Sequence, residues 1–101
     1  MYDKCMYGLI GKMIAKDGQR EALIAILLEG IEDMPGCRSY IVARDPADPL
    51  VIWITEVWDS MGSHQTSLAL PGVKAAISRA KPLIAGFGDY VVTDPVGGVG
   101  L

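Results

Sequence analysis

The sequence predicts an α+β domain in which four strands form one antiparallel sheet and helices cover one of its faces. Two helical segments alternate with four short segments rich in β-branched and aromatic residues. A short turn with two Asp-Pro pairs joins the middle strands, which makes them an antiparallel hairpin. Half of the 101 residues are apolar, so one domain with a hydrophobic core can form.

The first strand is predicted over residues 7–16. Gly8 and Gly11 weaken this strand and indicate a bulge or the close approach of another backbone. Asp17 is a candidate N-cap for the first helix. That helix is predicted over residues 19–33, because its apolar residues recur at spacings of three and four. A Met-Pro-Gly sequence ends it.

The second and third strands are predicted over Cys37–Arg44 and residues 50–58, on either side of the proline turn. A second helical region covers residues 60–70 and 73–80, with Pro71-Gly72 as an interruption. The last strand is predicted over residues 90–93, with an alternative start near Phe87.

The resulting order, β-α-β-β-α-β, is that of a ferredoxin-like fold with a four-stranded antiparallel sheet. One domain is expected over residues 1–94, followed by a glycine-rich tail over residues 95–101. A single domain with another strand order is the alternative.

The composition excludes several classes of function. The net charge of −3 and the isoelectric point near 4.9 argue against nucleic-acid binding, which needs a basic surface. Cys5 and Cys37 are interpreted as reduced thiols, and with one histidine they do not make a zinc site. No signal peptide and no apolar run long enough to span a membrane is recognisable, so a cytoplasmic location without membrane contact is expected.

Both faces of the third strand are apolar, although a sheet face in water should carry polar residues. Val51, Trp53, Thr55 and Val57 form one set, and the alternating set between them is equally apolar. The face away from the helices therefore needs a cover. We expect a second copy of the chain to supply it, in a homodimer with two-fold symmetry.

The unusual polar residues gather between Glu56 and His64. Glu56 lies in a strongly apolar strand, so its charge needs a partner. A backbone amide or an arginine (Arg38, Arg44 or Arg79) would make that partner structural, whereas His64 would make it functional. His64 shares a helical stripe with Met61 and Leu68, which is expected to face the sheet. It is either a hydrogen-bonded structural residue or a proton acceptor.

Trp53 and Trp58 are expected to point to opposite faces, one toward the helices and one toward the dimer interface. Either tryptophan can be a packing residue or the wall of a pocket for a flat aromatic ligand. Tyr40, Met61 and Met13 are candidates for the same pocket, because pockets for apolar ligands are lined mainly by such residues.

Several segments resemble the antibiotic biosynthesis monooxygenase (ABM) family of dimeric α+β barrels. They are TEVWDSMGSHQTSLALPGVKAAI at residues 55–77, AKDGQRE at 15–21 and EDMPGCRSY at 32–40. Glu56-x-Trp58 followed by His64 is the most specific part. The resemblance implies a pocket between sheet and helices in each subunit of a dimer. Members oxygenate quinols or phenolic polyketides without metal or flavin, while others degrade haem or isomerise small signalling compounds.

The resemblance implies roles for this chain's own residues. The haem-degrading branch of the family uses an asparagine on the first strand. This chain contains no asparagine, which argues against haem degradation. His64 is then expected to be the base and Glu56 to orient it, with no cofactor. Trp58, Trp53, Tyr40 and Met61 are expected to bind a small aromatic or quinone-like substrate. A non-catalytic binding dimer and an O₂-independent isomerase or cyclase are the alternatives.

Overall fold

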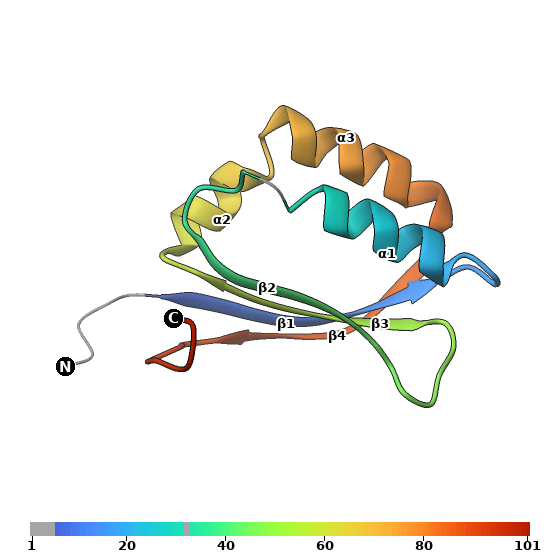
Figure 1. Cartoon of the computed structure of the whole chain (residues 1–101), viewed down its shortest axis with the longest axis horizontal. Coiled ribbons are helices and arrows are strands. Elements are labelled where there is room, and N and C mark those ends of the chain that lie inside the picture. Colours follow the sequence, from blue (N-terminus) through green and yellow to red (C-terminus); the bar gives the residue numbers. More distant parts are fainter. Residues whose placement is uncertain (1–5, 32) are drawn as a thin grey trace.

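The computed structural model describes residues 6–31 and 33–101. Its four strands form one antiparallel sheet in the order β2-β3-β1-β4, and the helices lie over one face (Figure 1). This arrangement confirms the ferredoxin-like α+β fold. The elements are β1 (Tyr7–Ala15), α1 (Arg20–Glu29), β2 (Cys37–Arg44), β3 (Val51–Trp58), α2 (Met61–Ser67), α3 (Pro71–Ala80), the short 3₁₀ helix η1 (Lys81–Leu83) and β4 (Ile84–Thr93).

Three boundaries differ from the predictions. Strand β4 begins at Ile84 rather than near residue 90, because it pairs with β1 along its whole length. Helix α1 ends at Glu29 with Gly30 as its C-cap, and Gln19 rather than Asp17 is its N-cap. Pro71 does not interrupt a helix but begins α3. A proline at that position loses no helical hydrogen bond.

The two glycines of β1 lie where this strand pairs with β4. A Cβ atom on Gly8 would lie 2.0 Å from Thr93 Oγ1 and 2.9 Å from Pro95 Cγ, so side chains at the end of β4, and not an approaching backbone, occupy the space beside Gly8. The pairing of the same two strands shifts its register between Gly11 and Met13, which is the predicted bulge.

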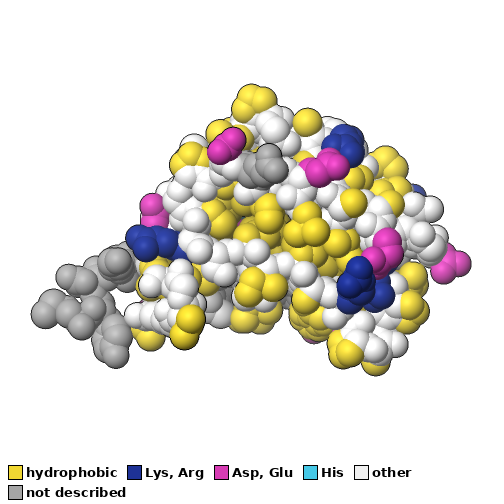
Figure 2. All heavy atoms as spheres, in the orientation of Figure 1, with side chains coloured by type: hydrophobic (Ala, Val, Ile, Leu, Met, Phe, Trp, Pro, Cys, Tyr) yellow, Lys and Arg dark blue, Asp and Glu magenta, His cyan; other side chains and the backbone are white. Residues whose placement is uncertain are grey.

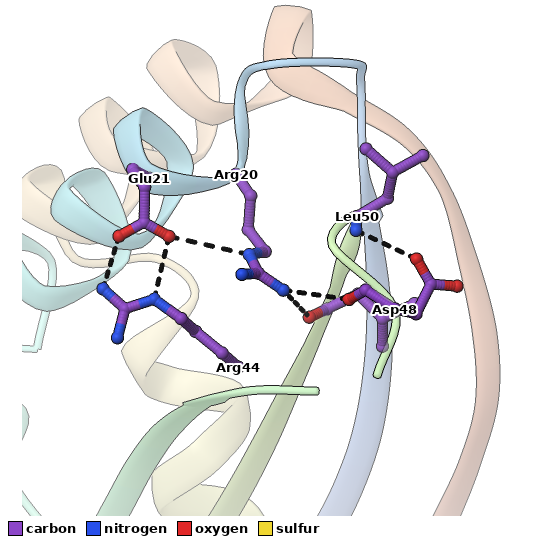
Figure 3. A network of polar contacts seen from close by, with 6 residues as sticks. Arg20, Glu21, Arg44, Asp48 and Leu50 are labelled. Carbon is purple, nitrogen blue, oxygen red and sulfur yellow. Dashed lines mark hydrogen bonds and ion pairs between the residues drawn. The ribbon is translucent and has the colours of Figure 1, made fainter. Parts of the chain in front are cut away.

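Two arginines tie the start of α1 to the β2–β3 hairpin (Figure 3). Arg44 makes a two-pronged contact with the Glu21 carboxylate, donating from Nε at 2.9 Å and from Nη2. This hydrogen bonding lowers the pKa of Glu21. Arg20 Nη1 donates to the carbonyl oxygen of Asp48 at 2.9 Å. Arg44 is therefore committed to Glu21 and is not the partner of Glu56.

The face of the sheet away from the helices carries its own polar cluster around Trp53. The indole Nε1 of Trp53 donates to Asp45 Oδ2 at 2.9 Å, and Lys12 Nζ lies 5.7 Å from the centre of the ring. The indole donor, followed by the backbone amides of Asp48 and Ala47, lowers the pKa of Asp45 to about 2. These contacts hold the β2–β3 turn on the side opposite the helices (Figure 1).

The hydrophobic core lies between the sheet and helices α1 and α3. Its buried residues are Ala15, Leu23, Ile26, Ile52, Ile54 and Ala80. Within the described part of the chain, no helix has the length and apolar character needed to cross a membrane. The space beside this core, between the same two layers, is not filled by side chains.

Candidate active site

A cavity of about 580 Å³ lies between the sheet and the helices, and every strand and helix contributes to its wall. Figure 2 shows hydrophobic side chains gathered in the hollow between the two layers. The large apolar lining residues are Met13, Leu27, Ile31, Met34, Ile54, Leu68, Val73, Ile77, Ile84 and Phe87. Such a lining, with a few polar groups, is typical of a binding site for a small apolar molecule.

One end of the cavity carries Glu56, Trp58 and His64. Trp58 Nε1 donates a hydrogen bond of 3.0 Å to Glu56 Oε1. The same carboxylate oxygen lies 3.8 Å from His64 Nε2, and only 16% of the Glu56 side chain and 19% of the His64 side chain are exposed. The 3.8 Å separation is that of an ion pair and is longer than a hydrogen bond. These three residues are called the acid–imidazole cluster below.

Local structure brings the cluster together. Alternation along β3 points Glu56 and Trp58 to the helix side of the sheet. Ser60 then begins α2 as its N-cap, with its hydroxyl accepting from the Ser63 amide at 3.1 Å. His64 follows one turn later, which returns its side chain to the sheet above Glu56.

Aromatic rings fix the position of His64. The imidazole lies edge-on to Trp58, with ring centres 5.4 Å apart, and 5.6 Å from the ring of Tyr7. Tyr7 is the β1 partner of Trp58. The sequence did not identify Tyr7, because its contact with His64 depends on the pairing of β1 with β3.

Tyr40 lies directly across from Glu56 on the neighbouring strand and also lines the cavity. Burial raises the pKa of the Tyr40 hydroxyl, and the nearby Glu56 charge raises it further. The hydroxyl therefore remains protonated at any physiological pH and can donate a hydrogen bond to a ligand oxygen.

Cys37 is a free thiol beside the same strand pair. Burial, followed by the Glu56 charge, raises the pKa of Cys37. This shift disfavours the thiolate, which is the nucleophilic form of a cysteine. The other cysteine, Cys5, lies outside the described residues.

The structure brings only part of the predicted pocket together. Glu56, Trp58, His64, Tyr40 and Met13 all line the cavity. Trp53 does not, because alternation on β3 places it on the opposite face, next to Lys12 and Asp45. Met61 does not either.

Met61 is the first residue of α2 and is 54% exposed. The residues of α2 that line the cavity are His64 and Ser67, and the C-cap Leu68 also lines it. The buried Ser67 hydroxyl is occupied by a 2.6 Å hydrogen bond to the carbonyl oxygen of His64.

The predicted arginine partners of Glu56 are placed elsewhere. Arg79 pairs with Glu29 at 2.8 Å, Arg44 pairs with Glu21, and Arg38 is exposed. Among residues 6–31 and 33–101, no three His, Cys, Asp or Glu side chains are grouped as metal ligands. The acid–imidazole cluster can accept a proton from a ligand and hold the resulting positive charge beside a carboxylate. The neighbouring Tyr40 hydroxyl can donate a hydrogen bond to the same ligand.

The fold and the cavity together define a ferredoxin-like α+β protein with an apolar small-molecule pocket between its sheet and its helices. The chain belongs to the antibiotic biosynthesis monooxygenase family, whose profile matches residues 6–79.

Solved structures agree with this assignment. A protein from Chloroflexus aurantiacus J-10-fl, assigned as an antibiotic biosynthesis monooxygenase, is 63% identical. The match covers 92% of this chain and 95% of that chain, with a TM-score of 0.90. No curated protein matches the chain.

More distant structures share the fold alone. A conserved protein from Methanosarcina mazei Go1 is 15% identical over 90% of this chain and 93% of its own, with a TM-score of 0.79. A conserved protein of unknown function from Bacteroides thetaiotaomicron VPI-5482 is also 15% identical, over 90% of this chain and 98% of its own, with a TM-score of 0.78.

Proposed function

We propose that the protein is a cofactor-independent monooxygenase acting on a small aromatic, quinol or polyketide-like substrate. The main support for the proposal is that Glu56 and His64 both line an apolar cavity, with Glu56 Oε1 3.8 Å from His64 Nε2. Oxygenation without a cofactor needs a substrate that can itself reduce O₂. A base and a dry pocket make such a substrate by creating an electron-rich anion.

In this mechanism His64 takes the proton of a phenol or of an acidic CH₂ group beside a phenolic ring. The Glu56 carboxylate stabilises the imidazolium, and the Tyr40 hydroxyl donates to the anionic oxygen. The anion passes one electron to O₂, and the substrate radical and superoxide combine to form a C–O bond. Return of the proton gives a hydroperoxide. Loss of water then leaves a carbonyl, so the balance is R₂CH₂ + O₂ → R₂C=O + H₂O.

Isotopically labelled O₂ tests this proposal. Purified protein is incubated with a tricyclic phenol that has an acidic CH₂ group, and oxygen uptake and product mass are measured. We expect one O₂ consumed per product and one labelled oxygen atom in the new carbonyl. Consumption of O₂ without label in the product would contradict a monooxygenase.

The same measurement separates the two alternative functions. A non-catalytic binding dimer would bind the phenol without consuming O₂ or changing it. An isomerase or cyclase would convert the substrate at an equal rate in air and under nitrogen, because proton transfer by the same base needs no O₂.

We further propose that the protein acts as a homodimer joined through the sheet face that the helices leave uncovered. Ile10, Ile41 and Val91 are exposed on neighbouring strands of that face. An apolar sheet face of this kind is typical of an interface. Light scattering at micromolar protein is expected to give twice the 10.8 kDa chain mass, and a monomer would contradict the proposal.

A further inference from the structure

The cavity has a second charged group, Lys81, at the end away from the acid–imidazole cluster. We propose that the substrate is an elongated apolar acid whose carboxylate pairs with Lys81 while its phenolic end reaches His64. This inference rests on the proposed function, because it names the class of molecule that the same cavity would take.

The strand pairing shows that the two polar ends are far apart. Glu56 lies opposite Leu9 on β1, whereas Ile84, three residues after Lys81, lies opposite Ala15. Leu9 and Ala15 are six residues apart along β1, which corresponds to about 20 Å. The amide of Lys16 donates to the carbonyl oxygen of Leu83 at 2.8 Å, so the 3₁₀ helix that carries Lys81 is fixed to that end of the sheet.

The charges along the cavity are complementary to such a molecule. Among the described residues of its wall, Lys81 is the one cationic side chain and Glu56 the one carboxylate. The described ion pairs engage Arg20, Arg44, Arg79 and His64, and none of them involves Lys81. Lys81 is an exposed residue at the rim of the cavity, so its ammonium group can pair with an anionic group that a ligand presents at that end.

A cation at this position also has a structural explanation. Lys81 directly follows the last residue of α3, and a positive charge at a helix C-terminus is favourable. That role alone would make Lys81 important for stability and irrelevant to ligand charge. Measurements of how the protein discriminates between charged and neutral ligands therefore distinguish the two roles.

Two fluorescent probes that differ by one anionic group provide this measurement. Anilinonaphthalene sulfonate carries a sulfonate, which stands in for the carboxylate, and N-phenylnaphthylamine is the same ring system without it. Lys81→Gln is expected to weaken sulfonate binding roughly two- to fivefold, the range of an exposed ion pair, and to leave the neutral probe unaffected. Lys81→Arg is expected to retain the preference, and added salt to reduce it in the wild type.

Lys74→Gln is the matched control, because Lys74 is an exposed lysine of α3 that does not line the cavity. An unchanged sulfonate affinity in Lys81→Gln, or an equal loss in Lys74→Gln, would overturn the proposal. Both probes report binding and not turnover. A protein that consumes no O₂ would still show the Lys81 effect, and a failure of the Lys81 effect leaves the oxygen assay unchanged.

Competition against the sulfonate probe tests the length of the substrate. Long-chain acids that end in a phenol are expected to displace the probe at lower concentration than a short phenolic acid, because they fill both ends of the cavity. Their methyl esters are expected to lose this advantage in the wild type. Equal displacement by acid and ester would contradict a carboxylate subsite at Lys81.

Discussion

Replacing His64 with alanine is expected to lower the turnover of an acidic phenol about 10²- to 10⁴-fold, the usual contribution of a general base. The imidazole of His64 can accept a proton from the substrate. The Glu56 carboxylate, whose Oε1 lies 3.8 Å from His64 Nε2, then stabilises the positive charge of the imidazolium. The measurement is the initial rate of O₂ uptake at saturating substrate, with circular dichroism to verify the fold.

Two further variants identify the cause of such a loss. Gln65 is the exposed neighbour of His64 on α2, so Gln65→Ala should leave turnover unchanged. Glu56→Gln keeps the shape of the site but removes the charge that stabilises the imidazolium, and a loss of roughly 10- to 100-fold is expected for such an orienting group. Full turnover in His64→Ala would remove His64 from the mechanism.

The sequence predicted the parts of the fold that are determined by neighbouring residues. Strand β2 has the predicted bounds and β3 begins one residue later than predicted, at Val51, because two prolines restrict the turn between them. Strand β4 was predicted too short, since Gly86 and Gly88 give its first half little strand character. That half is a strand because β1 supplies its hydrogen-bond partners, and such long-range pairing is not visible in local sequence.

The same distinction applies to the candidate site. Glu56, Trp58 and His64 come from one continuous segment, so strand alternation and one helical turn were enough to make His64 one of the candidate partners of Glu56. Tyr7 reaches His64 only through the pairing of β1 with β3. Lys81 lines the cavity at the end where β4 begins its pairing with β1. Trp53 was grouped with the pocket on its residue type, although its position on β3 points it to the other face.

Replacing Trp58 with alanine is expected to lower the free energy of unfolding by about 3–5 kcal/mol, the usual cost of removing a buried aromatic side chain. Trp58 is 1% exposed and is one of the largest fully buried side chains. A loss of this size is a large part of the about 5–15 kcal/mol that stabilises a typical domain. Denaturant unfolding followed by circular dichroism measures it, and a change below about 1 kcal/mol would contradict the packing role.

Trp58→Phe separates the packing role from the role in the site. Phenylalanine keeps most of the buried ring but removes the indole N–H that donates to Glu56 Oε1 at 3.0 Å. A half-buried carboxylate that loses a donor costs about 1–3 kcal/mol, so this variant should still fold. If Trp58 also positions Glu56 beside His64, O₂ turnover should fall in Trp58→Phe by about as much as in Glu56→Gln. Normal turnover in the folded variant would show that Trp58 serves only the core and that His64 holds Glu56 in place without it.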